Sequence, residues 1–146
     1  MREILFRGKR TDNGEWVEGC YSKGFRNPNT AQLEDLIYMF SGKPGEWEFD
    51  YAVVIPETVG QYTGLTDKNG KKIFEGDICS SKGMVYQVIW LDDKYGWFCK
   101  VLKSNSCLID MTMAFPLYQY DNRPENGYRQ LEVIGNIHDN PELMEE

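Results

Sequence analysis

The stretch that decides the fold runs from Val54 to Cys79 and reads VIPETVGQYTGLTDKNGKKIFEGDIC. Two runs of β-forming residues, 59–65 and Ile73-Phe74, predict a pair of strands. Between them, Asp67-Lys68-Asn69-Gly70 is a hairpin-loop signal, a type I turn that the glycine closes in the left-handed conformation. This stretch therefore predicts a β-hairpin and, with it, a mainly β architecture.

On the C-terminal side, short apolar runs alternate with turn residues. Gly76 breaks the strand that ends at Phe74 and permits a sharp bend. Further strands are expected at 78–80, 84–91, 97–102 and 130–137. The run 84–91 is apolar on both sides, which indicates a central strand. Asn140 and Pro141 then predict the cap and the first residue of a short C-terminal helix.

On the N-terminal side, Ile4–Arg10 and Trp16–Tyr21 predict a second hairpin around Asn13-Gly14. This dipeptide suits a type I′ turn or a type I turn closed by a left-handed glycine. Leu33, Leu36, Ile37 and Phe40 follow a helical spacing, but 36–40 also suits a buried strand. We favour a hairpin of 36–40 with 47–55, with or without a short helical turn before it.

Five or six short strands separated by Gly and Asn turns are typical of a small barrel. We therefore expect a mainly β protein with a small SH3-like barrel over about residues 59–137 and N-terminal β-hairpins packed beside it. The expected division is 1–58 for the hairpin region and 59–146 for the barrel with its cap, or one integrated unit. The residues expected to shape turns are Gly14, Asp67, Asn69, Gly70, Gly76 and Asp77.

Composition restricts the functional classes. The 146 residues carry a net charge of −7, and an acidic surface repels phosphate backbones and anionic membranes. No apolar run approaches the length of a membrane-spanning helix, which needs about 20 residues. The N-terminus lacks the apolar core of a signal peptide. We therefore expect a cytoplasmic protein that binds no membrane.

The potential metal ligands are scattered. Cys20, Cys79, Cys99 and Cys107 form no C-x-x-C pair, and His138 is the one histidine. Reduced cysteines packed as small apolar residues explain this pattern better than a zinc site. We expect no metal and no cofactor.

No catalytic motif stands out either. The sequence contains no nucleophile elbow, no dinucleotide-binding glycine pattern and no P-loop. The acids Glu57, Glu75, Asp77, Asp92 and Asp93 are better explained as turn and surface residues than as an acid–base pair. His138 has no nucleophile in a recognisable motif. We therefore expect a protein that is not an enzyme.

Aromatic residues are the remaining signal, at 14% of the chain. Core packing explains most of them, but a second cluster can line a groove for a peptide or a stacked base. Those that exceed the needs of turns are Trp16, Tyr21, Tyr62, Trp90, Trp97 and Tyr118. The candidate binding residues combine two of these aromatic residues with the basic side chains of the first strand. They are Arg7, Lys9, Arg10, Trp16 and Tyr62.

Three blocks of the chain resemble the YopX family of small phage and prophage proteins. They are MREILFRGKRTDNGEWVEG at 1–19, the stretch 54–79 quoted above, and LEVIGNIHDNPEL at 131–143. The resemblance implies an SH3-like barrel, a bacterial cytoplasmic location and no established biochemical activity. It supplies no catalytic residues.

Three hypotheses follow. The first is a phage or prophage accessory protein that acts as a non-enzymatic protein–protein interaction module, with a host or phage protein as its unknown partner. The second is a nucleic-acid-associated module that uses the basic first hairpin, and the third is a small enzyme without a recognisable motif. The acidic composition and the missing motifs rank them in that order. A basic head at residues 1–10 and an acidic tail are also compatible with a homo-oligomer.

Overall fold

The structure is a computed structural model that describes residues 2–120 and 130–145, and it confirms the mainly β class. The chain divides into two compact units, Met1–Tyr62 and Thr63–Glu146, which are described separately. The division lies inside strand β5 (Gly60–Thr66), and the expected division at 58/59 lies directly after the 3-10 helix η1 (Pro56–Thr58).

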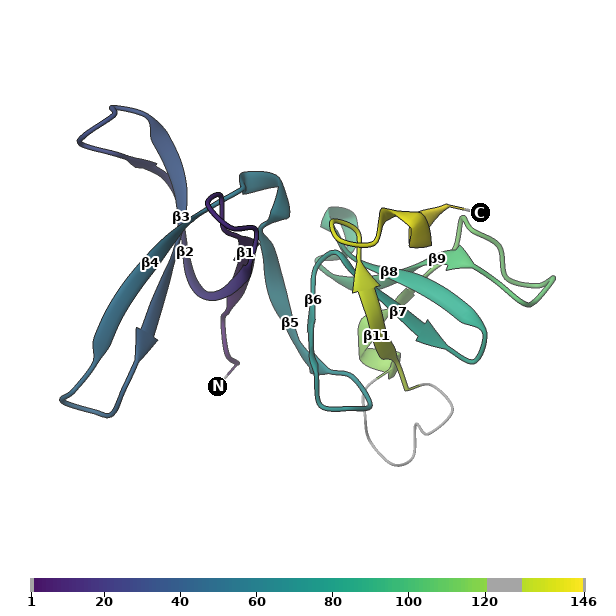
Figure 1. Cartoon of the computed structure of the whole chain (residues 1–146). Helices are drawn as coiled ribbons and strands as arrows, with labels where there is room; N and C mark the ends of the chain where they lie inside the picture. Colours follow the sequence, from purple (N-terminus) through teal and green to yellow (C-terminus); the bar gives the residue numbers. More distant parts are fainter. Residues whose placement is uncertain (1, 121–129, 146) are drawn as a thin grey trace. The chain divides into compact units, whose positions relative to one another are not determined.

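Unit 1 is built on antiparallel strands, drawn in purple and blue in Figure 1. They are β1 (Phe6–Lys9), β2 (Trp16–Arg26), β3 (Leu33–Ser41) and β4 (Glu48–Val54). Within unit 1 the strand order is β4-β3-β2-β1-β5, so β4 lies at one edge. β1 pairs with β5 through Phe6 opposite Gln61 and Arg7 opposite Gly60.

The core of unit 1 lies on one face of this sheet. Ile37, Ala52 and Val54 are buried there, and alternation along β3 and β4 brings them to the same side. The partly buried residues packed against them are Phe6, Val17, Tyr21, Met39 and Val59. Tyr21 also donates its hydroxyl to a carboxylate oxygen of Asp35 at 2.5 Å, which joins β2 to β3.

The structure decides between the two interpretations of residues 33–40. The hairpin is confirmed, because β3 pairs with β4 from Asp35 opposite Val54 to Ser41 opposite Glu48. The helical alternative is wrong. Helical spacing would have placed Leu33 and Phe40 on one buried face, whereas their exposed fractions are 63% and 60%.

Both predicted glycine turns are confirmed, with φ at +73° for Gly14 and +81° for Gly70. Asn13 is not among the residues with positive φ, so the first turn is type I closed by a left-handed glycine. The type I′ alternative is wrong for this turn. Gly70 donates its N–H to the Asp67 carbonyl at 3.0 Å, as the three-residue hairpin loop requires.

Unit 2 contains a five-stranded antiparallel sheet with the order β10-β9-β8-β7-β11. Its strands are β7 (Asp77–Ser81), β8 (Met84–Leu91), β9 (Gly96–Lys103), β10 (Ala114–Pro116) and β11 (Glu132–Asn136), and the short β6 (Lys72–Phe74) precedes them. The 3-10 helices of the unit include η2 (Asp92–Lys94), η3 (Leu117–Tyr120) and η5 (Pro141–Met144). β8 is central, as predicted.

The sheet of unit 2 is open within residues 63–120 and 130–145, where β10 and β11 form its two edges. The closed SH3-like barrel therefore stays a prediction. The expected C-terminal helix is the 3-10 helix η5, which begins at Pro141. Asn140 does not cap it through its side chain, because its Oδ1 accepts the N–H of Asn136 instead.

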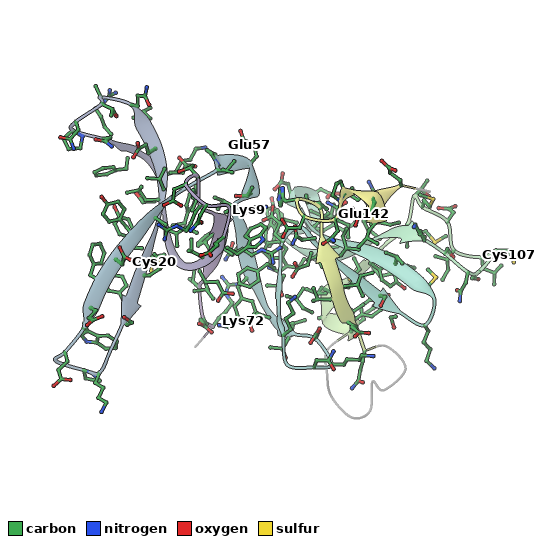
Figure 2. The ribbon with its side chains drawn as sticks, viewed as in Figure 1. Lys9, Cys20, Glu57, Lys72, Cys107 and Glu142 are labelled. Atoms are coloured by element: carbon green, nitrogen blue, oxygen red, sulfur yellow. The ribbon has the colours of Figure 1, made fainter. Side chains whose placement is uncertain are left out.

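The core of unit 2 is larger than that of unit 1. Its buried members are Ile73, Cys79, Met84, Tyr86, Val88, Cys99, Val101, Leu117 and Leu131. Two of them are thiols with no measurable exposure, Cys79 and Cys99, whereas Cys20 and Cys107 are exposed and labelled in Figure 2. The prediction that cysteines serve as packing residues is therefore correct for Cys79 and Cys99 and wrong for the other two.

The carboxylate of Asp67 joins the hairpin loop to the last strand. It is 1% exposed and accepts the N–H groups of Asn69 and Lys71 at 2.9 Å and of Val133 at 3.0 Å. The N–H of Lys68 adds a bond to the Leu131 carbonyl at 2.9 Å. The β5–β6 loop and β11 are far apart in the sequence, so this buried carboxylate connects the two ends of unit 2.

We predict that Asp67→Ala lowers the free energy of unfolding by about 3 kcal/mol, because it leaves buried N–H groups without their charged acceptor. Asp67→Asn keeps one acceptor oxygen and is expected to lose less. Urea unfolding followed by circular dichroism measures both.

The matched control is Asp93→Ala, an exposed acid in η2 of the same unit, with an expected change within about 0.5 kcal/mol. Equal losses for Asp67→Ala and Asp93→Ala would show that the buried carboxylate does not connect the unit.

A second prediction concerns pH. Burial raises the pKa of the Cys99 thiol to about 12 and that of Cys79 well above its usual value. Burial and the bond to Asp35 raise the pKa of Tyr21 to about 12. Because the folded chain keeps these groups neutral, their contribution is complete below about pH 9 and is lost as the pH rises towards about 12. Unfolding midpoints in urea should fall over that range.

Thiol labelling at pH 8 provides the control. Cys20 and Cys107 should react in the native protein, and Cys79 and Cys99 should react after urea is added. Rapid labelling of all the thiols in the native state would contradict the burial on which this pH dependence rests.

Candidate functional site

The structure brings three of the predicted binding residues together in unit 1. Arg7 and Lys9 share one face of β1, and Trp16 lies directly opposite Lys9 on β2. The Arg7 guanidinium carbon is 4.7 Å from the centroid of the Trp16 ring, and the Lys9 ammonium is 5.7 Å from it. Arg7 is 8% exposed. The indole is therefore covered by cations of its own chain.

The other two predicted binding residues lie apart from this cluster. Arg10 forms a bidentate ion pair with Asp12, and both nitrogen–oxygen distances are 2.9 Å. Tyr62 is buried in β5, and its N–H donates to the Leu5 carbonyl at 2.7 Å. Residues 1–19 carry four basic and four acidic side chains, so the first hairpin as a whole is neutral.

The predicted turn residues of the central stretch are placed as follows. Asp67, Asn69 and Gly70 form the loop described above. Gly76 has a φ of +87° between β6 and β7, and the 1% exposed Asp77 accepts the N–H of Phe74 at 2.8 Å. The two carboxylates therefore accept backbone N–H groups, as turn residues do.

The candidate acids and the histidine are placed as follows, with the His138 imidazole beside Gly76, which separates Glu75 from Asp77 in the sequence. Glu57, Glu75, Asp92 and Asp93 are exposed, and the backbone N–H of His138 donates to the Asn136 side chain at 3.0 Å. Within residues 2–120 and 130–145, no three His, Cys, Asp or Glu side chains are grouped as metal ligands would be.

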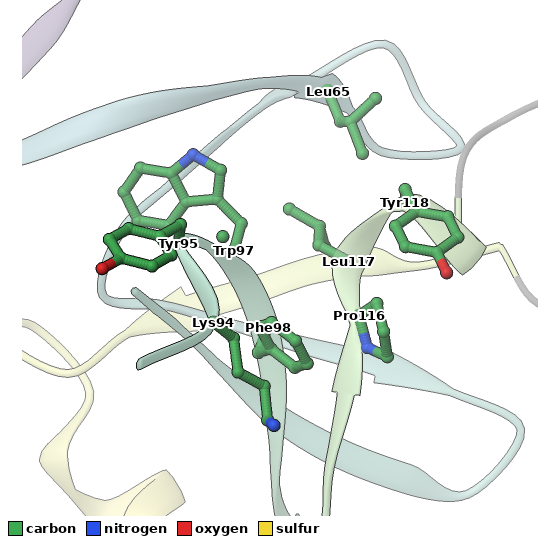
Figure 3. A pocket seen from close by; sticks show the side chains of 9 residues that line it. Leu65, Lys94, Tyr95, Trp97, Phe98, Pro116, Leu117 and Tyr118 are labelled. Carbon is green, nitrogen blue, oxygen red and sulfur yellow. The ribbon is translucent and has the colours of Figure 1, made fainter. Parts of the chain in front are cut away.

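An aromatic groove in unit 2 is the better-formed site (Figure 3). Its volume is about 470 Å³. The residues that line it are Leu65, Lys94, Tyr95, Gly96, Trp97, Phe98, Pro116, Leu117 and Tyr118. We call it the unit 2 groove.

Two short segments build this groove. Antiparallel pairing of β9 with β10 sets Pro116 opposite Phe98 and so brings the start of η3 beside the start of β9. The turn before β9 contributes Tyr95, whose left-handed backbone (φ +50°) lies at the end of η2. Trp97 packs edge-on against Trp90, with the ring centroids 5.1 Å apart.

The rims of the unit 2 groove are exposed and its floor is buried. Tyr95 and Tyr118 are 85% and 68% exposed, whereas Leu117 is 2% exposed and belongs to the core. A large ring held at the surface costs free energy of hydration unless something covers it, and such rings mark binding surfaces. Figure 3 shows the rings of Tyr95 and Tyr118 on opposite sides of Leu117.

The chemistry of the unit 2 groove suits binding. Its side chains offer hydrogen-bond donors from Lys94, two tyrosine hydroxyls and one indole, with apolar ring faces between them. Among the described residues, no carboxylate, imidazole or thiol belongs to its lining, so these lining residues supply no acid–base pair and no cysteine nucleophile.

Sequence reasoning found only part of this groove. Trp97 and Tyr118 were among the excess aromatic residues, but neither was a candidate binding residue. Tyr95, Phe98 and Pro116 gave no signal, because turn residues surround Tyr95 and the pairing that brings Pro116 to Phe98 is tertiary.

Among the described residues, no helix has the length and apolar character to cross a membrane.

Comparisons with known proteins agree with the resemblance seen in the sequence. The chain is similar to a solved structure, protein EF1440 from Enterococcus faecalis, with 25% identity and a TM-score of 0.54 over 99% of this chain and 100% of the other. No curated protein matched. The family model described as YopX protein matches residues 5–145. The chain therefore belongs to the YopX family.

Proposed function

We propose that this protein is a non-enzymatic interaction module, a phage or prophage accessory protein of the bacterial cytoplasm, and that its unit 2 groove binds an extended, proline-containing segment of a partner protein. The observation that carries the proposal is the pair of exposed rings, Tyr95 and Tyr118, over an apolar floor.

Aromatic grooves of this kind suit polyproline segments. A polyproline II helix is extended before it binds, so little conformational entropy is lost when its rings lie between aromatic side chains. Its carbonyl oxygens are unpaired acceptors, and the tyrosine hydroxyls, the indole of Trp97 and the ammonium of Lys94 are donors. The donor-rich lining of the unit 2 groove therefore complements an acceptor-rich backbone.

The strand edges of the five-stranded sheet are less suited to a partner. β10 has three residues and ends at Pro116, which has no N–H to offer a new strand. β11 already gives the N–H of Val133 to Asp67. Short or covered edges disfavour strand addition, which supports side-chain recognition in the groove.

The nucleic-acid alternative has weaker support. It relied on the basic first strand, but Arg7 and Lys9 cover Trp16 and Arg10 pairs with Asp12. Phosphate binding needs cations that face solvent together. The enzyme alternative has no recognisable catalytic motif to support it, and among the described residues no three His, Cys, Asp or Glu side chains are grouped as metal ligands would be.

We predict that decaproline binds the unit 2 groove in the full chain and changes the amide resonances of residues 94–98 and 117–118 in a saturable NMR titration. Tyr95→Ala and Tyr118→Ala should each weaken binding about fivefold or more, because each removes one exposed ring face from the contact. Both side chains are exposed, so unfolding midpoints should stay close to those of the parent protein.

Tyr51→Ala is the matched control, since it removes a tyrosine that is 54% exposed in unit 1. An alanine-rich peptide of the same length controls for nonspecific contact. The proposal is wrong if decaproline leaves the groove resonances unchanged at millimolar concentration, or if the control variant weakens binding as much as Tyr118→Ala does.

A further inference from the structure

Unit 1 carries a set of neighbouring aromatic rings on its β3–β4 hairpin, and we call the residues Tyr38, Phe40, Phe49 and Tyr51 the aromatic face. Register places Tyr38 opposite Tyr51 and Phe40 opposite Phe49. Ring centroids are 5.5 Å apart for Tyr38 and Phe49 and 5.3 Å apart for Phe40 and Phe49. Phe40, Phe49 and Tyr51 are 60%, 57% and 54% exposed, and Figure 2 shows rings projecting from this hairpin on the left of the view.

Folding of unit 1 leaves Phe40, Phe49 and Tyr51 exposed, although Leu36, on their side of the strands, is 2% exposed. The core residues Ile37, Ala52 and Val54 lie on the opposite side of the same strands. An antiparallel sheet that packs one side on a core normally carries polar side chains on the other. A row of exposed rings in that place indicates a surface that something covers.

A cavity of about 300 Å³ adjoins the aromatic face. Tyr38, Phe49 and Tyr51 form one wall, and Glu34 with the β2–β3 turn around Asn27 forms the other. The Asn27 amide nitrogen lies 3.3 Å and 3.4 Å from the two oxygens of Glu34. The cavity therefore combines ring faces with a carboxylate that is held in position.

Charge selects the occupant. Residues 33–54 contain five acidic side chains and one lysine. Strand alternation places Glu34 on the side of the aromatic face, whereas Asp35, Glu48 and Asp50 lie on the other side of the strands. A second copy would bring the same negative charge to the surface, and nucleic acid would bring phosphates, so both are repelled. A cationic segment is attracted by the Glu34 carboxylate beside the rings and by the negative faces of the rings themselves.

The chain already shows this chemistry within itself, where the Arg7 guanidinium lies 4.7 Å from the Trp16 ring centroid. Arginine suits the cavity better than lysine does, because its planar guanidinium can lie on a ring and still donate two hydrogen bonds to a carboxylate.

We propose that the aromatic face and the Glu34 cavity bind an arginine-bearing basic segment of a partner protein. The guanidinium pairs with Glu34 and lies against the neighbouring rings, and the flanking side chains of the segment cover Phe40 and Phe49. This site belongs to unit 1 and does not depend on the function proposed for the unit 2 groove.

The test is fluorescence anisotropy of a labelled peptide of alternating arginine and alanine residues, titrated with the full chain at physiological ionic strength. We expect saturable binding that Glu34→Gln and Phe49→Ala each weaken about fivefold or more. Phe49→Tyr keeps a ring and should bind within about twofold of the parent protein. The lysine analogue of the peptide should bind more weakly than the arginine peptide.

Two matched controls separate this site from general attraction to an acidic protein. Glu57→Gln makes the same change in net charge at an exposed acid outside the aromatic face, and Leu33→Ala shortens a 63% exposed side chain on the other side of β3. Both should bind within about twofold of the parent protein, and circular dichroism should show all variants folded.

The inference is overturned if Glu57→Gln weakens binding as much as Glu34→Gln does, or if the glutamate analogue or a single-stranded oligonucleotide binds this face instead. Sedimentation of the parent protein and of Phe49→Ala tests whether a second copy of the chain covers the aromatic face. A dimer of the parent protein that Phe49→Ala abolishes would assign the aromatic face to a second copy of the chain.

Discussion

The buried carboxylate of Asp67 is the constraint on which unit 2 depends. A two-residue hairpin can close with backbone bonds alone, but this loop places a charged group at 1% exposure and satisfies it with N–H groups from two distant parts of the chain. Burying a carboxylate without such donors would be very unfavourable. The hairpin loop and β11 must therefore be formed together, which links local turn chemistry to the closing of the unit.

The unit 2 groove depends indirectly on this arrangement, through the strand order of the sheet. With β11 held by Asp67, the opposite edge of the sheet is left to the short β10, and the chain leaves that strand through Pro116 directly into η3. This path holds Leu117 in the core and leaves Tyr118 at the surface. The exposed ring is thus held by a buried neighbour, and preorganisation of this kind lowers the entropy cost of binding.

Unit 1 uses the same residue classes in a different way. The cations of its first hairpin contact Trp16 or pair with Asp12, whereas its second hairpin exposes rings beside the Glu34 carboxylate. A basic strand is therefore not a basic surface here. What a partner meets depends on which charges the fold has already paired, and the acidic hairpin has more charge left to offer than the basic one.

The sequence by itself determined the β class, the turns and the family. Asn-Gly and Asp-Lys-Asn-Gly signals act over a few residues, so Gly14 and Gly70 could be assigned their left-handed backbone without any tertiary contact. The spacing of the apolar residues could not decide whether residues 33–40 form a helix or a strand, because a short apolar run satisfies both patterns. Only pairing with β4 resolved it, since that pairing buries Ile37 and leaves Phe40 exposed. The candidate sites also depend on strand pairing. Phe98 and Pro116 meet through the pairing of β9 with β10, and Tyr38 meets Phe49 across β3 and β4. Cross-strand neighbours of this kind are set by register rather than by local sequence.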